Sequence, residues 1–170
     1  DQLRKLGSIG YESLGTDFIK ILDEDGREVA PGEVGELYSR GPMLFSGYYK
    51  LPEKTAEAFR GEWFSAGDMA RRDADGFYEI VDRKDNMIIT GGENVYPAEI
   101  EGVLAQHPGI VEAAVIGQTS AKWGESPLAI VVKSDPNLTE AEVIEFCRGK
   151  LAGYKQPKAA VFVDEIPRNP

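Results

Sequence analysis

Short runs of alternating hydrophobic and polar residues dominate the first half of the chain. The run DFIKIL at 17–22 alternates in this way, and the Asp25-Gly26 pair that follows it favours a hairpin turn. The same pattern, again bounded by Gly and Asp turns, recurs at 34–41 and 63–83, with one short helix expected within 51–63. Several short strands joined by such turns predict a small antiparallel, β-barrel-like unit.

The second half of the chain follows a different pattern. A helix is expected to begin at Pro97, because the apolar residues after it then share one face. Thr139 and Glu142 have the spacing of a capping box, which predicts a second helix that runs to about Leu151. Apolar runs predict strands at 110–117, 128–133 and 159–163. This alternation predicts a compact α/β unit with a short mixed sheet and flanking helices.

The change of pattern falls near residues 83–86, so we expect a domain boundary there. The two expected domains are residues 1–84 and residues 85–170, and the expected fold class is α+β. With 170 residues, the chain is long enough to give each domain a core of its own. It begins at Asp1 and stops inside a polar turn, from which we expect it to be a piece of a longer protein.

Composition narrows the possible partners and chemistry. A net charge of −10 argues against binding to a nucleic-acid backbone, because no basic excess is available to replace counterions. No apolar run approaches the roughly 20 residues of a membrane-spanning helix. Cys147 is the single cysteine and His107 the single histidine, which leaves little material for a zinc site or a Ser/His/Asp triad, so no metal site is expected. The lone cysteine suits a reducing compartment, and a cytoplasmic location is expected.

One acidic and one basic residue form the first candidate site. Asp68 follows Gly67 at the end of a strand-like run, where an ionised carboxylate could accept two hydrogen bonds from a vicinal diol such as ribose. Arg83 lies fifteen residues later, across a hairpin, and could reach the same ligand. The alternative is a turn aspartate and a surface arginine with no shared ligand.

The stretch TGGEN is the second candidate site. Gly91 and Gly92 allow positive φ and a close approach of backbone to a ligand, but the Walker and dinucleotide-binding patterns are both absent. These residues alone favour a plain strand-to-helix turn. Trp123 and Tyr154 lie in polar loops, where an aromatic ring could stack on adenine, line a channel or anchor the loop to the core.

The order of these motifs is more informative than any one of them. The elements W-F-x-x-G-D, D-R-x-D and G-G-E-N-x-x-P-x-E-I-E follow one another within residues 61–101. This stretch resembles the segment that joins the two domains of acyl-adenylate-forming enzymes, the superfamily of acyl-CoA synthetases, peptide-synthetase adenylation domains and beetle luciferases. The resemblance covers essentially the whole chain.

The resemblance implies a reaction and its cofactors. Such enzymes use ATP and Mg²⁺ to convert a carboxylic acid into an acyl-adenylate and pyrophosphate, and a thiol, here expected to be CoA, then displaces AMP. Residues 1–84 would be the end of a large N-terminal region, the rest of which lies upstream, and residues 85–170 most of a mobile C-terminal domain. The family's catalytic lysine would lie just beyond Pro170, so no catalytic residue is expected in this chain, and the chain alone is expected to be inactive.

Roles for individual residues follow from the same resemblance. Asp68 matches the ribose-binding aspartate, Arg83 the arginine that reaches the ribose or phosphate, and Asp85 the hinge residue. The glycine loop, Gly91, Gly92 and Glu93, would border the pantetheine tunnel in the thiol step, and Trp123 and Tyr154 would lie near CoA. Gln156 stands where some relatives carry an arginine, so no phosphate contact is expected from it.

The form GGENVYPAEIE favours an acid–CoA ligase, with a role in fatty acid metabolism among the possibilities. Two alternatives remain open, a ligase that loads a carrier protein and a non-catalytic binding homologue. Fatty, aromatic and short-chain acids all remain possible substrates.

Overall fold

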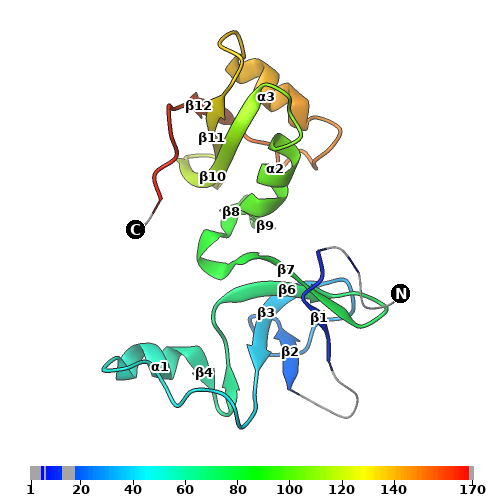
Figure 1. The fold of residues 1–170 in the computed structure, drawn as a ribbon, viewed down its shortest axis with the longest axis vertical. Helices are drawn as coiled ribbons and strands as arrows, with labels where there is room; N and C mark the ends of the chain where they lie inside the picture. Colours follow the sequence, from blue (N-terminus) through cyan, green and yellow to red (C-terminus); the bar gives the residue numbers. More distant parts are fainter. Residues whose placement is uncertain (1–4, 6, 13–17, 169–170) are drawn as a thin grey trace. The chain divides into compact units, whose positions relative to one another are not determined.

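The computed structural model of the chain describes residue 5, residues 7–12 and residues 18–168. The chain divides into two compact units, Asp1–Asp85 and Asn86–Pro170, and each unit has its own sheet (Figure 1). The expected α+β class is confirmed, because antiparallel strands dominate and the helices are few and short.

Among its described residues, the first unit forms a seven-stranded antiparallel sheet with one short α-helix. Its strand order is β1-β7-β6-β3-β5-β4, and β2 pairs with β3 as well. The elements are β1 (Gly10–Tyr11), β2 (Ile19–Leu22), β3 (Val34–Ser39), α1 (Pro52–Ala58), β4 (Phe59–Arg60), β5 (Trp63–Phe64), β6 (Asp68–Arg72) and β7 (Phe77–Arg83). Asp17, part of the first predicted strand, lies outside the described residues.

The sheet of the first unit does not close into a barrel among the described residues. Its strand order is an open path with β1 at one end and β4 at the other. A closed barrel needs a continuous, staggered ladder, and β1, β4 and β5 have only two residues each. The core is correspondingly small and consists of Ile21, Ala70 and Tyr78, with three half-buried residues against it.

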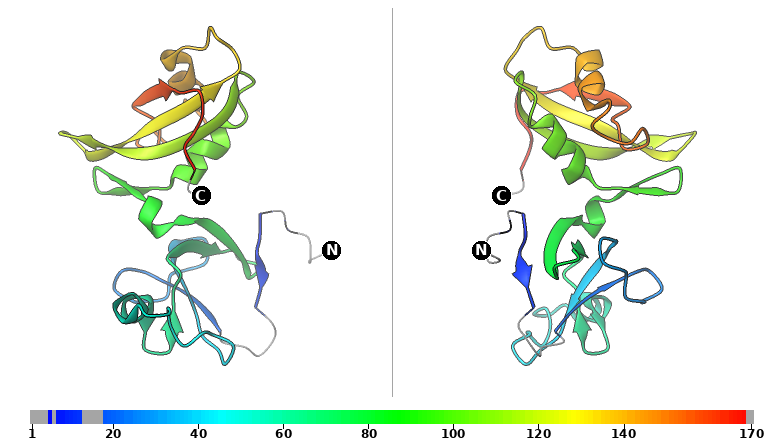
Figure 2. Two further views of the ribbon diagram at one scale, coloured as in Figure 1. Left: turned by 60° about the vertical axis from the view of Figure 1, so that its left-hand side comes forward. Right: turned by 90° about the vertical axis from the view of Figure 1, so that its right-hand side faces the viewer.

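The second unit is built on a long hairpin of β10 (Ile110–Ser120) and β11 (Gly124–Lys133), which Figure 2 shows as its longest feature. β12 (Ala159–Phe162) pairs with β11 in parallel, whereas β8 (Ile88–Thr90) pairs with β11 and with β9 (Glu93–Val95) in antiparallel fashion. The predicted mixed sheet is therefore confirmed. The two hairpin strands extend beyond the predicted 110–117 and 128–133, into a polar stretch.

Two helices pack against this sheet, α2 (Pro97–Leu104) and α3 (Glu140–Cys147). α2 begins at the predicted proline, and Thr139 forms the predicted capping box with Glu142. The prediction that α3 runs to about Leu151 is wrong, because Arg148 is extended and Gly149 takes a φ of 75° that a helix cannot continue through.

All the elements of the second unit contribute to one core, in which Cys147 is fully buried. Burial raises the pKa of the Cys147 thiol, which keeps it protonated and unreactive. His107 is half-buried in the loop after α2, and its ring packs edge-on against Phe146 with 4.6 Å between the ring centroids. The core residues are Ile88, Val95, Ile100, Leu104, Ile110, Val115, Ala129, Val131, Leu138, Val143, Cys147, Leu151 and Ala160.

Over the part of the chain that the structure describes, no helix has the length and apolar character needed to cross a membrane.

Candidate functional site

The hairpin of β6 and β7 brings Asp68 and Arg83 together. The two residues are paired across the ladder, and Arg83 Nη1 donates to Asp68 Oδ1 at 2.9 Å. Arg83 Nη2 also donates to the carbonyl of Ala66 at 2.9 Å. A carboxylate has about four acceptor positions, so this ion pair leaves Asp68 capacity to accept further hydrogen bonds. The proximity expected from the sequence is confirmed.

A bulge in the hairpin decides which residue faces Asp68. Ala70 pairs with Ile80, whereas Met69 pairs with Asp82, so Val81 is an extra residue on β7. A regular ladder without the bulge would pair Met69 with Val81 and would place Asp82 opposite Asp68. The bulge therefore replaces a repulsive pair of carboxylates with an arginine and an aspartate.

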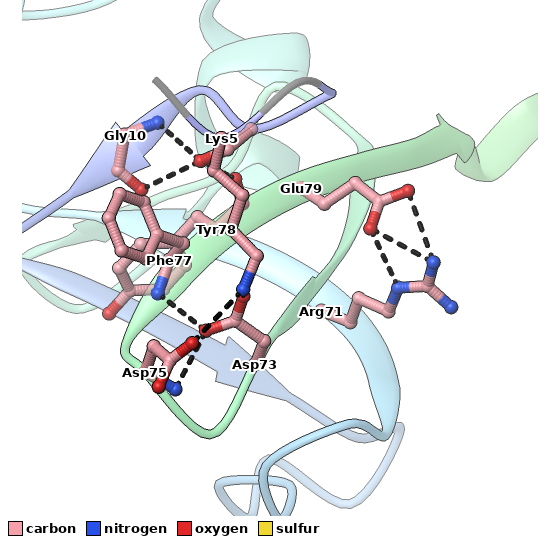
Figure 3. Close-up of polar contacts among 9 residues, drawn as sticks. Lys5, Gly10, Arg71, Asp73, Asp75, Phe77, Tyr78 and Glu79 are labelled. Carbon is pink, nitrogen blue, oxygen red and sulfur yellow. Dashed lines mark hydrogen bonds and ion pairs between the residues drawn. The ribbon is translucent and has the colours of Figure 1, made fainter. Parts of the chain in front are cut away.

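The other end of the same hairpin is closed by Asp73 (Figure 3). Its Oδ1 accepts hydrogen bonds from the backbone N–H groups of Asp75 at 2.9 Å and Phe77 at 3.0 Å, and its other oxygen contacts the Lys5 ammonium. Arg71 and Glu79 form an exposed ion pair across the strands at 2.9 Å. The hairpin is thus fixed at its turn, away from Asp68 and Arg83.

The turn that precedes Asp68 is held by a partly buried carboxylate on β3. Glu36 accepts from the Ser65 hydroxyl and from the Lys84 ammonium, each at 2.7 Å. Burial alone would raise the pKa of Glu36, but the hydrogen bonds from Lys84 and Ser65 outweigh it and hold that pKa below its usual value. Gly67 takes a φ of 81° in this turn, which a residue with a side chain rarely adopts.

Sequence reasoning missed Glu36, Ser65 and Lys84. Lys84 stands next to Arg83 in the chain, but only the pairing of β3 with β6 brings Glu36 within reach of it. No short-range pattern carries that information. The one available signal was the small-residue run SAG before Asp68, which indicates a tight turn.

Asp85 lies in a single 3₁₀ turn, Lys84–Asn86, between β7 and β8. It is exposed and is the last residue of the first unit. Few residues connect the two sheets, and none of those in the turn is buried. The predicted hinge residue therefore lies in the short connection where one unit ends and the next begins.

The glycine loop is the tip of a β-hairpin, and the expected strand-to-helix turn is wrong. Thr90 of β8 pairs with Glu93 of β9 across Gly91 and Gly92, whose φ values are 60° and 88°. Two consecutive residues with positive φ are what a two-residue turn of the I′ type needs. The helix starts only afterwards, at Pro97. Gly91, Gly92 and Glu93 are all exposed at this tip.

Trp123 supports the glycine hairpin from the turn between β10 and β11. The Gly91 N–H donates to the Trp123 carbonyl at 2.9 Å. A β-carbon on Gly91 would lie 3.0 Å from Cε3 of the Trp123 ring, a contact so tight that the ring would have to shift by a few tenths of an ångström. The indole remains half-exposed, with the Lys122 ammonium 4.5 Å from its centre. Trp123 thus combines packing on the hairpin with an open ring surface.

Tyr154 lies in the turn before β12 and is 41% exposed. The neighbouring Lys155 pairs with Glu99 of α2 at 2.6 Å. Among the residues described by the structure, no hydrogen bond or ring contact joins Tyr154 to the glycine hairpin. Two residues after Tyr154, the side-chain amide of Gln156 donates to the carbonyl of Leu151 at 3.1 Å, which gives this amide a structural partner.

The ligands implied by the sequence fit these residues to different degrees. Asp68 and Arg83 offer adjacent acceptors and a cation, which suits a ribose and a phosphate. Within the described ranges, no group of three His, Cys, Asp or Glu side chains is placed to hold a metal ion. We therefore assign no step to Mg²⁺ on the residues of this chain.

Comparison with known proteins gives two matching family models. The model described as AMP-binding enzyme matches residues 1–49, and the model of the AMP-binding enzyme C-terminal domain matches residues 99–170. The long-chain-fatty-acid–CoA ligase of Escherichia coli O157:H7 is 47% identical over 163 residues, which are 96% of this chain and 29% of that protein.

Two solved structures match with high similarity. The o-succinylbenzoate CoA synthetase of Bacillus subtilis, in complex with its acyl-adenylate intermediate, has a TM-score of 0.88 and 38% identity over 97% of this chain and 34% of that one. ATP-bound MatB from Rhodopseudomonas palustris has a TM-score of 0.85 and 39% identity over 96% of this chain and 33% of that one. Apo MatB from the same organism has a TM-score of 0.67 and 40% identity over 98% of this chain and 34% of that one. The chain spans about a third of the length of these relatives.

The contact between Gly91 and Trp123 gives a testable prediction. Gly91→Ala is expected to lower the free energy of unfolding by more than Gly92→Ala, measured by urea denaturation. Both substitutions carry the roughly 1–2 kcal/mol cost of a side chain at positive φ. Only Gly91→Ala also forces the Trp123 ring to move, because no atom lies within 4 Å of a β-carbon at Gly92. Equal losses in the two variants would contradict the packing role of Trp123.

Proposed function

The chain belongs to the AMP-binding, acyl-adenylate-forming enzymes, and we propose that it supplies the nucleotide contact and the hinge of an ATP-dependent acid–CoA ligase. One observation carries the proposal. Asp68 and Arg83 are paired at the end of a hairpin, and the chain turns at Asp85 only two residues later. A nucleotide contact and a pivot are thus joined with almost no chain between them.

In the first half-reaction, a carboxylate oxygen of the acid attacks the α-phosphorus of ATP. The new bond is the carboxyl–phosphate anhydride, and the bond to pyrophosphate breaks. We assign Asp68 to the ribose hydroxyls, where its carboxylate accepts their hydrogen bonds. Arg83 orients that carboxylate and places a positive charge near the nucleotide. Reactions at phosphorus depend chiefly on such positioning and charge neutralisation.

In the second half-reaction, a thiol attacks the acyl carbon and the carbon–oxygen bond to AMP breaks. We assign the glycine hairpin, Gly91 to Glu93, to the border of the thiol's path. The absence of side chains on Gly91 and Gly92 leaves room for a narrow pantetheine arm. Trp123 and Tyr154, each with an open ring face, are assigned to the surroundings of CoA. CoA is the proposed acceptor because the curated relative named above is a CoA ligase.

The two half-reactions are proposed to use different orientations of the two domains, residues 1–84 and 85–170, about Asp85. A hinge needs only a few residues that absorb a large change in φ and ψ. The acid is left open, since the relatives named here act on a long-chain fatty acid and on o-succinylbenzoate.

The 170-residue chain alone is expected to be inactive, because it spans only about a third of the length of the relatives that it matches. The check is pyrophosphate release by the purified chain with ATP and a panel of acids. Release above the protein-free background would contradict this assignment of parts.

Asp68→Ala in the whole enzyme is expected to raise the KM for ATP by about 10-fold or more, because the ribose loses a charged hydrogen-bond acceptor worth roughly 1.5–3 kcal/mol. Asp75→Ala, in the turn of the same hairpin, is the control. Pyrophosphate exchange measures both variants. An unchanged KM for ATP in Asp68→Ala would refute the ribose contact.

Asp85→Pro in the whole enzyme is expected to slow thioester formation more than adenylation. Proline fixes φ near −65° and restricts the preceding residue as well, so the turn loses the freedom that rotation requires. Single-turnover measurements of acyl-adenylate and thioester formation separate the two steps. A loss of the same size in both steps would count against a hinge at Asp85.

Comparing free CoA with a holo carrier protein as acceptor, in the unsubstituted enzyme, decides between the CoA ligase and the carrier-loading alternative.

A further inference from the structure

We propose that the ion pair between Glu36 and Lys84 anchors the fixed side of the hinge and confines domain rotation to the residues after Lys84. This inference rests on the proposed function and adds a pair of positioning residues to it. Neither residue is expected to touch the nucleotide or the thiol. Their role is to hold the segment from which the rotation starts.

The anchor begins on the central strand of the first unit. Glu36 belongs to β3, where its backbone pairs with Leu22 of β2 on one side and with Met69 of β6 on the other. Its side chain is 14% exposed, and its two oxygens are used by different partners, the Ser65 hydroxyl and the Lys84 ammonium. A carboxylate fixed at its backbone and at both oxygens has little freedom to move.

Lys84 is held through both its side chain and its backbone. The ammonium donates to Glu36 at 2.7 Å, and the backbone N–H donates to the Gly67 carbonyl at 2.7 Å. The hydrogen bond with Glu36 raises the pKa of Lys84, and the pKa of Glu36 is lowered, so both groups are charged at neutral pH. The residue directly before Asp85 is therefore tied to the sheet at two points.

The backbone bond from Lys84 to Gly67 links this anchor to the turn beside the proposed nucleotide site. Arg83 bonds to Asp68 and to the Ala66 carbonyl, Lys84 bonds to Gly67, and the Gly67 N–H donates to the Ser65 hydroxyl at 3.0 Å. The turn of residues 65–68 and the pair Arg83-Lys84 thus form one hydrogen-bonded block with Glu36 at its base. If Lys84 is released from Glu36, the block loosens next to the pivot, and rotation is spread over more residues.

The consequence falls mainly on the step that follows rotation. Adenylation uses Asp68 and Arg83, whose direct contacts do not involve the Lys84 ammonium. Thioester formation needs the second domain to arrive in one orientation, and small errors of position are costly for a bound reaction. Loosening the residues next to the hinge therefore lowers the rate of thioester formation more than the rate of adenylation.

The test compares the two half-reactions in the whole enzyme. Lys84→Met keeps a side chain of similar length but removes the charge, and is expected to slow thioester formation by about 5- to 10-fold while adenylation changes by less than about 2-fold. Lys84→Arg keeps the charge and should restore the ratio of the thioester-formation rate to the adenylation rate. Arg71→Met removes the exposed partner of Glu79 in the same hairpin, shown in Figure 3, and is the matched control with an unchanged ratio.

A second measurement reports on the anchor without depending on activity. Amide hydrogen exchange in the peptide that contains Lys84 is expected to become faster in Lys84→Met than in Arg71→Met, because the bond to the Gly67 carbonyl opens more often. A normal ratio of half-reactions in Lys84→Met, or the same shift in Arg71→Met, would overturn the inference. Failure of the unsubstituted enzyme to form either product would overturn the proposed function, and is seen before any variant is compared.

Discussion

The pairing of β6 with β7, with one extra residue at Val81, is the constraint on which the candidate site depends. Regular pairing would align Asp68 with Asp82 and place two carboxylates opposite each other. The bulge shifts the ladder by one position and aligns Asp68 with Arg83 instead. It also sets the end of β7, and therefore the place where the chain turns at Lys84–Asn86. A single backbone irregularity thus determines both the pair assigned to the nucleotide and the start of the connection between the units.

The two units differ in their cores, and the difference suits a first unit that stays fixed and a second unit that moves. The second unit has one core to which two helices and all five strands contribute, so it can turn as a single body. Among the described residues of the first unit, the core is small and consists of Ile21, Ala70 and Tyr78. Its order near the hinge comes largely from polar contacts, with Glu36 and Arg83 each making several. Polar contacts of this kind demand defined geometry, which is what a pivot needs at its fixed end.

Local sequence signals predicted the elements that local physics controls. Pro97 started α2 and Thr139 capped α3 because a fixed φ and a side-chain acceptor act within a few residues. The strands β10 and β11 were longer than predicted, since backbone pairing continues through residues 118–120 and 124–127, where no apolar alternation marks it. The glycine hairpin was misjudged because Gly-Gly suits several turns, and the pairing of Thr90 with Glu93 selects one of them. The contact of Glu36 with Lys84 spans 48 residues, and no spacing rule could reveal it.

The most direct test of the central claim is the distance between the two domains in the whole enzyme at each stage of the reaction. Spin labels at cysteines introduced for Glu62 and Gln118, both exposed, would report it, and the buried Cys147 would not compete for labelling. A stable acyl-adenylate analogue, with and without CoA, defines the two stages. The account predicts two distinct distance populations whose proportions change when CoA is added. One distribution that stays the same in both states would contradict a pivot at Asp85.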